Sequence, residues 1–376
     1  MKVIFLLEVI PHYRIDFFNQ LSERGGVVLI IIVPKGTKEK LSKIQTKGIK
    51  FTIIELDTKY IKSGRKYFLY FKNLTSTVKK TRPDILVLSS NFRYIQNTLL
   101  FLMKAAGRYK ILYWTHGTKK VPSVKSYKHI EGIYNKIIDS LFVDGFLVYT
   151  HDSDDFYKSI KIPENKIFIF NNTINVEKNR ETFEAIREEE IRLQLEKFKI
   201  ENEKNIVFIG RLIEKKSPQV VINYWLKLRK IFKDLGLIMI GDGPLLENIK
   251  KLNYKNLTAI GGLYDEKVIA CLMKASLFVF CPTYSGLNIN HAFSYGKPFV
   301  TFESNDHGPE IVYVRNGENG LILNPNSPAE NIRRITAMIS CRDEYEKYSR
   351  TAWETGSTLT LSNMVHNCTE AFTRVL

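Results

Sequence analysis

The sequence has little cysteine and no long apolar run among its 376 residues. Its four cysteines all lie after residue 270 and show neither C-x-x-C pairing nor metal-ligand spacing, which argues against a disulfide framework or a zinc site. The longest apolar run, Val27–Val33, is far shorter than the ~20 residues that span a bilayer, so we expect no transmembrane helix. The segment Met1–Glu8 favours a buried first strand over a signal peptide. We therefore expect a protein of the reducing cytoplasm.

Acidic residues are scarce in the first half of the chain, which carries almost all of the net charge of +17. Residues 1–180 contain 31 lysines and arginines against 15 acidic residues, and the remainder is nearly neutral. Such an excess either aids solubility or marks binding to nucleic acid or to an anionic membrane leaflet. No zinc-finger, helix-turn-helix or RNA-binding signature is present, which favours the membrane. The run Lys59–Tyr67 interleaves basic and aromatic residues, as at a lipid headgroup interface or in a solvated loop.

Short apolar segments alternate with longer amphipathic ones, which predicts βαβ units and parallel sheets. Two helical patterns in the first half are Tyr13–Arg24 and Tyr67–Lys80. The expected strands are 2–7, 27–33, 51–55, 85–88, 110–114, 145–149, 166–170, 205–209, 237–240, 257–260, 277–280, 298–302 and 320–323. The predicted class is therefore α/β, with two doubly wound, Rossmann-like domains that face a cleft.

A charged segment without an apolar strand, Asn175–Lys204, separates the two series of strands and contains one expected exposed helix, Arg180–Phe198. We place the domain junction there. The first domain is expected to cover residues 1–175 and the second residues 176–354, with a C-terminal helix of about residues 355–376 packing back on the first. Ligands of doubly wound sheets bind beyond the carboxyl ends of the strands, so the loops that follow strands carry the most chemical weight.

Two loops of the second half combine glycine with polar residues. Gly210 follows a strand and precedes Arg211 and Lys216, two cations that could straddle a diphosphate, although basic loop residues are usually only solvated. The next strand ends in a G-x-G turn formed by Gly241 and Gly243. This turn permits a ligand to approach the backbone closely, and it is equally consistent with a tight turn alone.

A third loop joins a strand to a helix. It contains Gly286, and the helix that follows ends at Gly296. The free backbone amides at the start of such a helix, together with its dipole, form an anion site. His291 lies in the first turns of this helix, where a histidine is either a hydrogen-bonded core residue or a ligand contact.

Taken together, these elements resemble the retaining glycosyltransferases of family 4, which have the GT-B architecture. The resemblance covers about residues 205–325 and rests on Gly210–Lys216, Ile240–Pro244, Ser285–Pro298, Gly308–Val312 and Asn316–Leu321. The first half is similar more loosely, through Trp114–Gly117 and Ile162–Asn175.

The resemblance implies a nucleotide-sugar donor, expected to be a UDP-sugar, and no other cofactor. We expect the donor to be bound by Gly210, Gly241, Gly243, Thr283, Ser285, Gly286, Leu287, Asn288, His291 and Glu310. Arg211 and Lys216 are the expected catalytic cations, because fixed charges lower the barrier to departure of a diphosphate. His116, after a first-domain strand, is expected near the transferred sugar, or is a structural histidine at a strand end.

The chain departs from the family at two positions. Members usually carry a Glu, seven residues and a second Glu; the first typically meets donor-sugar hydroxyls and the second the nucleotide ribose. Thr283 and His291 stand at these positions. A neutral imidazole both donates and accepts, so His291 could bind a ribose hydroxyl. Asp152–Asp154 matches the D-x-D metal signature literally, but it opens a polar loop, and we interpret the match as chance and expect no metal.

The predicted function is metal-independent transfer of a hexose, with retention of configuration, to a glycan or lipid-linked acceptor. We expect a role in bacterial surface polysaccharide biosynthesis, such as lipopolysaccharide or capsule, at the inner face of the plasma membrane and without a nucleic-acid partner. Residues expected at the membrane are Lys59, Tyr60, Lys62, Arg65, Lys66, Tyr67, Phe68 and Tyr70. The alternatives are a non-catalytic nucleotide-sugar or glycan binding subunit, a nucleic-acid binding protein and a sugar-nucleotide epimerase.

Overall fold

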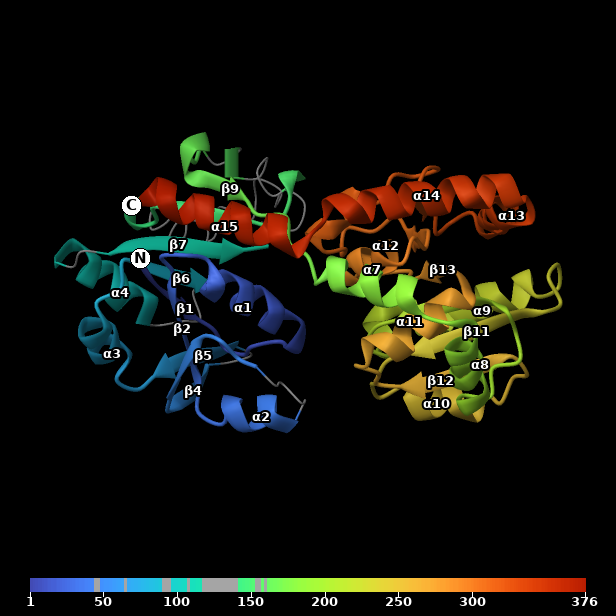
Figure 1. Cartoon of the computed structure of the whole chain (residues 1–376), viewed down its shortest axis with the longest axis horizontal. Helices are drawn as coiled ribbons and strands as arrows, with labels where there is room; N and C mark the ends of the chain where they lie inside the picture. Colours follow the sequence, from blue (N-terminus) through green and yellow to red (C-terminus); the bar gives the residue numbers. More distant parts are fainter. Residues whose placement is uncertain are drawn as a thin grey trace. The chain divides into compact units, whose positions relative to one another are not determined.

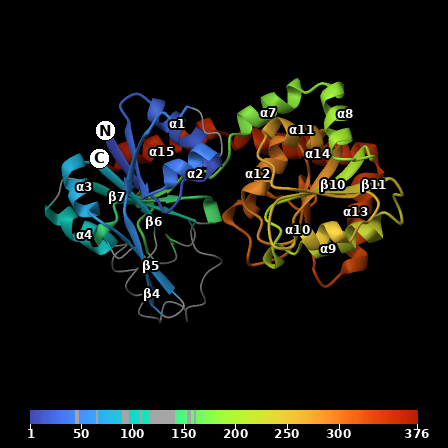
Figure 2. The same cartoon turned by 90° about the horizontal axis from the view of Figure 1, so that it is seen from below.

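The structure, a computed structural model, describes residues 1–43, 48–63, 66–89, 96–106, 109–116, 141–152, 157–158 and 161–376. Arg65, Gly117 and Asp154, named above, lie outside the described residues. The chain divides into two compact units, Met1–Asn172 with Leu361–Leu376, and Thr173–Thr360 (Figures 1 and 2). Within the described part of the chain, no helix has both the length and the apolar character needed to cross a membrane.

The first unit is built on a seven-stranded parallel sheet of order β3-β2-β1-β6-β7-β8-β9. Its strands, with a separate hairpin of β4 and β5, are β1 (Lys2–Leu6), β2 (Val28–Pro34), β3 (Thr52–Leu56), β4 (Thr58–Ser63), β5 (Lys66–Phe71), β6 (Ile85–Ser89), β7 (Lys110–Thr115), β8 (Gly145–Val148) and β9 (Ile167–Ile169). Its helices are η1 (His12–Arg14), α1 (Ile15–Glu23), α2 (Thr37–Lys43), α3 (Leu74–Thr81), α4 (Gln96–Ala106), η3 (Glu164–Lys166) and α15 (Leu361–Val375).

Alternate residues of β1 face opposite sides of this sheet, as the period of two in a strand requires. Val3 and Phe5 pack in a hydrophobic cluster with α1 and α15, whereas Ile4 and Leu6 pack in another with α3 and α4. Both faces are therefore covered by helices, and the last helix of the chain completes the core of the first unit.

The second unit has a six-stranded parallel sheet of order β12-β11-β10-β13-β14-β15. Its strands are β10 (Lys204–Ile209), β11 (Leu235–Ile240), β12 (Leu257–Gly261), β13 (Ser276–Phe280), β14 (Phe299–Phe302) and β15 (Gly320–Leu323). Its helices are α7 (Val176–Ala185), α8 (Glu188–Lys197), η4 (Glu214–Lys216), α9 (Pro218–Leu228), α10 (Leu246–Lys251), α11 (Glu266–Lys274), α12 (Leu287–Ser294), η5 (Pro309–Tyr313), α13 (Pro328–Ser340) and α14 (Arg342–Thr358).

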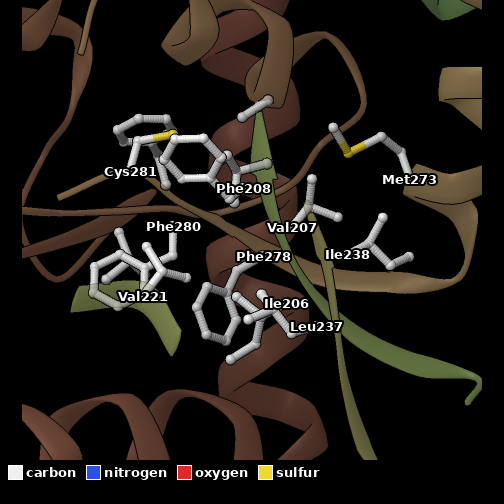
Figure 3. Packing of buried hydrophobic residues seen from close by; sticks show 14 of the residues in the cluster. Ile206, Val207, Phe208, Val221, Leu237, Ile238, Met273, Phe278, Phe280 and Cys281 are labelled. Atoms are coloured by element: carbon white, nitrogen blue, oxygen red, sulfur yellow. The ribbon is translucent and has the colours of Figure 1, made fainter. Parts of the chain in front are cut away.

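The core of the second unit fixes the position of this sheet. Figure 3 shows side chains of three adjacent strands, among them Ile206, Leu237 and Phe278, packed together, and all three are buried. Trp225 of α9 is fully buried and donates its indole N–H to the carbonyl of Leu235 at 2.9 Å. Because full burial of a large apolar side chain contributes roughly 2–3 kcal/mol, this core holds the strand ends, and the loops that follow them, in place.

The predicted α/β class with two doubly wound sheets is confirmed. Every strand expected from the sequence is present within two residues of its predicted ends. In the second unit the strand order reverses between β10 and β13, which makes the carboxyl ends of these two strands the expected ligand position.

The prediction of a helix over Tyr67–Lys80 is wrong in its first half. β5 occupies Lys66–Phe71 and pairs antiparallel with β4, and α3 begins only at Leu74. The strand is stabilised by this pairing and by burial of Leu69 and Phe71, which local spacing of apolar residues does not reveal.

The predicted single helix over Arg180–Phe198 is two helices, α7 and α8. Ile186 interrupts them with an extended backbone, φ −70° and ψ 130°, and buries its side chain in the core. Helix α8 then starts with a capping interaction, in which the N–H of Arg187 donates to the carboxylate of Glu190 at 3.0 Å. A buried apolar residue next to a capping signal therefore outweighs the helix propensity of the charged residues.

Candidate functional site

The loops after β10 and β11 lock together through their backbones. A Cβ atom on Gly241 would lie 1.9 Å from the carbonyl oxygen of Gly210, and one on Gly243 would lie 2.3 Å from that of Leu212. The N–H of Leu212 donates to the carbonyl of Asp242 at 2.8 Å. Contact between the two loops therefore already requires glycine at both positions of the G-x-G turn, whether or not a ligand also approaches there.

Two hydrogen bonds join the loop after β10 to the loop after β13. The ammonium of Lys216 donates to the carbonyl of Tyr284 at 2.8 Å, and the hydroxyl of Thr283 donates to the carbonyl of Lys215 at 2.8 Å. Since β10 and β13 are neighbours at the point where the strand order reverses, Lys216 is fixed at the ligand position expected for this sheet. The hydroxyl of Thr283 is committed to the backbone.

Arg211 is the second cation of the loop after β10. Its side chain is exposed, and it forms no hydrogen bond or ion pair with the residues that the structure describes. Lys216, five residues further on, is only partly exposed. With Lys215, the loop carries three cations and one carboxylate, Glu214, at the carboxyl edge of the sheet, and an anion is the ligand for which this net positive charge is suited.

His307 was not found from the sequence, yet it holds the turn before α12. The N–H of Ser285 donates to Nδ1 of His307 at 3.1 Å, and Nε2 of His307 lies 2.8 Å from the carbonyl of Phe302. Because an N–H can only donate and a carbonyl can only accept, the ring is the neutral tautomer with its proton on Nε2. His307 therefore fixes the turn that leads to the helix start.

Gly286 begins helix α12 beside a buried carboxylate. Its N–H donates to the side-chain oxygen of Asn288 at 2.8 Å, which sets the first turn ahead of Leu287. A Cβ on Gly286 would lie 3.4 Å from Oε2 of Glu310, and one on Gly308 would lie 2.7 Å from the same oxygen. The structure thus places Glu310, from η5, beside the turn formed by Ser285, Gly286 and Asn288.

His291 lies in the second turn of α12 and contacts a carboxylate from another helix. Its Nε2 is 3.0 Å from Oε2 of Glu266, the first residue of α11. The hydroxyl of Tyr295 donates to the same oxygen at 2.8 Å, and burial together with Glu266 raises the pKa of Tyr295. Neither Glu266 nor Tyr295 was singled out from the sequence, because their partnership spans 25 residues or more and has no local spacing signature.

His116, the first-unit residue of the predicted site, follows β7. Its ring centroid lies 4.3 Å from that of Tyr149 at the end of β8. Loss of hydration among neighbouring atoms, and the charge of Arg14, lower the pKa of His116, which favours the neutral imidazole. Among the residues that the structure describes, no group of three or more histidine, cysteine, aspartate or glutamate side chains is arranged to hold a metal ion.

Comparison with known proteins relates the second unit to one family of enzymes. Residues 190–355 match the family model described as glycosyl transferases group 1. An uncharacterized glycosyltransferase of Methanocaldococcus jannaschii is 27% identical over 363 residues, which cover 90% of this chain and 87% of that protein. These findings support a group 1 glycosyltransferase.

Three solved structures share the fold of this chain. HepE of Anabaena in complex with UDP has a TM-score of 0.75 at 14% identity and covers 99% of this chain and 100% of that chain. WaaG, a glycosyltransferase involved in lipopolysaccharide biosynthesis, has a TM-score of 0.67 at 14% identity, with 99% of each chain covered. UDP-GlcNAc 2-epimerase from Neisseria meningitidis, bound to UDP-GlcNAc, has a TM-score of 0.69 at 16% identity and covers 99% of this chain and 100% of that chain. Since an epimerase shares the fold, the fold alone does not select the reaction.

Proposed function

We propose that the protein is a retaining glycosyltransferase of family 4 type, which transfers a hexose from a nucleotide sugar, expected to be a UDP-sugar. The observation that carries the proposal is the placement of Arg211 and Lys216 in one loop at the reversal of strand order, next to the turn that starts α12. The presence of UDP or a UDP-sugar in structures of the same fold supports this choice of donor.

The second unit supplies electrostatic stabilisation of the leaving group. Transfer of the sugar breaks the bond between its anomeric carbon and the diphosphate, and negative charge builds up on the departing oxygen. The ammonium of Lys216, the guanidinium of Arg211 and the first amides of α12 are positive groups held by the fold, so they need no reorganisation during the reaction. In this proposal these groups stabilise the negative charge of the departing diphosphate without a metal ion.

Retention of configuration is the finer part of the proposal. The acceptor attacks from the face that the diphosphate leaves, so no side chain has to form a covalent intermediate. The hydroxyl of Thr283 already donates its hydrogen to the backbone carbonyl of Lys215. We therefore propose that Glu310 and the Ser285–Gly286 turn, rather than Thr283, recognise the sugar. We propose that the first unit binds the acceptor and that His116 contributes there as a neutral imidazole.

The proposed acceptor is a glycan or a lipid-linked sugar of a bacterial surface polysaccharide pathway. The role of WaaG in lipopolysaccharide biosynthesis supports the pathway, and the basic first half of this chain supports an anionic membrane surface as the place of reaction. The β4–β5 hairpin supplies exposed aromatic and aliphatic side chains beside lysines, namely Lys59, Tyr60, Ile61, Lys62, Tyr67 and Tyr70.

A panel of nucleotide sugars tests the proposal. A ligand that binds only the folded state raises the melting temperature by mass action. UDP-, GDP-, ADP- and CDP-sugars are added separately, and release of the nucleoside diphosphate is then followed for those that stabilise the protein. We expect one base to stabilise the protein and to be released from its sugar. No stabilisation by any of the four would contradict the proposal, and stabilisation without turnover would favour the non-catalytic binding subunit.

A further inference from the structure

The pair formed by Glu266 and His291 is the strongest unexplained feature of the second unit. The side chain of His291 is only 12% exposed, and its Nε2 lies 3.0 Å from Oε2 of Glu266. The buried hydroxyl of Tyr295 donates to the same oxygen. A carboxylate at the first position of a helix is stabilised by the helix dipole, so Glu266 offers a charged acceptor to both partners.

These contacts fix the tautomer of the imidazole. A carboxylate has no proton to donate, so Nε2 of His291 must carry the proton that lies between them. In the neutral ring, Nδ1 is then an acceptor, and it has no hydrogen bond to any residue that the structure describes. His291 therefore presents a hydrogen-bond acceptor, as a carboxylate would.

The position of the pair relates it to a ligand. Glu266 follows β12 and His291 lies in the first turns of the helix after β13, so both belong to the carboxyl edge of the sheet. This is the edge that carries Lys216 and Gly286, and ligands of doubly wound sheets bind there. The ribose of a nucleoside diphosphate is bonded directly to the inner phosphate, so a nucleotide whose diphosphate binds those groups also has its ribose at this edge. Ribose hydroxyls can donate hydrogen bonds to an imidazole nitrogen.

We infer that Glu266 is a positioning residue, which holds His291 in the tautomer and orientation that accept a hydrogen bond from a ribose hydroxyl of the donor. The inference rests on the proposed function. Glu266, on α11, keeps Nδ1 of His291, on α12, unprotonated and able to accept a hydrogen bond. Tyr295 keeps the carboxylate in place through its own hydrogen bond.

Binding of UDP and of 2′-deoxy- and 3′-deoxy-UDP, measured by calorimetry, tests the inference. In the parent protein, loss of the recognised hydroxyl is expected to weaken binding about tenfold. Glu266→Ala should weaken the binding of UDP about tenfold. The ratio of the dissociation constants of the deoxy analogue and UDP should then be close to one. Glu266→Gln keeps an oxygen that accepts from Nε2, so it should restore most of the ratio. His291→Ala should match Glu266→Ala, and the double variant should be no weaker than either.

A matched control separates positioning from folding. Glu190→Ala removes a partly buried ion pair to Lys267, the neighbour of Glu266 on α11, and does not change His291. It should leave the ratio between UDP and its deoxy analogues unchanged. If Glu266→Ala lowers the melting temperature but keeps the parent ratio, the pair is structural and the inference is overturned. If the parent binds none of the four nucleoside diphosphates, the proposed function fails, and the inference fails with it.

Discussion

Lys216 is the residue on which the proposed chemistry depends most. Its ammonium has three N–H donors, and one of them donates to the carbonyl of Tyr284. This hydrogen bond fixes the position of the charge and leaves two donors for a ligand. Lys216→Ala should lower kcat/KM for the nucleotide sugar about a hundredfold, because a lost charge-assisted contact to the leaving group costs roughly 3 kcal/mol.

Steady-state kinetics checks this expectation against a second lysine. Lys250 lies on α10 of the same unit and forms an exposed ion pair with Glu247. Lys250→Ala should therefore keep the parent kcat/KM. Activity of Lys216→Ala within twofold of the parent would show that the lysine is a structural link between two loops and nothing more.

Gly243 offers a test of the loop contact that frames the site. An added Cβ would lie 2.3 Å from the backbone oxygen of Leu212, and the residue has φ +157°. Gly243→Ala should destabilise the second unit by about 3 kcal/mol or more, because rigid backbone cannot yield as a side chain can. Gly317 also has a positive φ, +87°, but open space around it, so Gly317→Ala should cost only about 1–2 kcal/mol. Urea unfolding measures both, and equal losses would show that backbone strain alone accounts for the glycine.

The residues of the site could be predicted only where a motif is local. Gly210, Lys216 and Gly286 follow strands, so their positions in the chain mark them as candidates. His307 and Glu266 were missed, because each acts on a side chain or amide more than 20 residues away and only the folded sheet brings them together. The contact of Gly241 with the loop after β10 could not be predicted for the same reason.

At the scale of elements, the β4–β5 hairpin is the part most suited to a membrane surface. Lys59 stands opposite Tyr70 and Ile61 opposite Phe68, so these four side chains share one face of the hairpin. The other face buries Leu69 and Phe71 in the core of the first unit. The hairpin is thus anchored near its base by Leu69 and Phe71, whereas Tyr60, Lys62 and Tyr67, on that same face, are exposed nearer its tip.

We expect the protein to sediment with anionic vesicles at low salt and to be released at high salt, because attraction between exposed charges is screened within ~8 Å at physiological ionic strength. Lys59→Glu with Lys62→Glu should reduce binding at least tenfold, since each basic residue near the surface contributes about 1 kcal/mol and reversal also adds repulsion. The matched control is Lys79→Glu with Lys80→Glu on α3, which makes the same change of charge elsewhere in the first unit. Equal binding to anionic and neutral vesicles, or an equal loss in both variants, would leave the basic charge as an aid to solubility.

A second element-scale prediction concerns the contact between α8 and α11. Hydrogen bonds from Lys267 and from the backbone of Arg187 hold the pKa of Glu190 at about 2, below its ordinary value. A depressed carboxylate pKa stabilises the fold above the pKa of the unfolded chain, about 4.3, and this stabilisation is lost as the pH falls toward 2. Glu190→Gln should therefore flatten the pH dependence of unfolding between about pH 5 and pH 2. The same acid dependence in parent and variant would contradict the assignment.

The strands could be predicted because each is a short apolar run bounded by polar residues, and burial on both faces of a parallel sheet demands that pattern. The hairpin and the break at Ile186 could not. A strand such as β5 is half exposed and depends on its partner, and Ile186 leaves the helix because of a core that lies beyond its own segment. Local propensity decides neither case.

At the scale of the whole molecule, the chain folds as two α/β units of different charge. The basic half supplies the first unit, which the chain re-enters at Leu361 to complete the core with α15. The second unit matches the glycosyl transferase family model over most of its length and contains the loop of Arg211 and Lys216. The proposal assigns the acceptor and the membrane to the first unit and the nucleotide sugar to the second.

The most direct test of this account is the anomeric form of the sugar that the protein releases. Proton NMR at early times, before mutarotation, follows an α-linked nucleotide sugar selected by thermal stabilisation, with Lys216→Ala as the control. The account predicts release of the nucleoside diphosphate together with the α-anomer by the parent, and about a hundredfold slower release by the variant. The β-anomer would contradict retention, a C2-epimerised sugar would identify an epimerase, and equal release by parent and variant would contradict the proposed site.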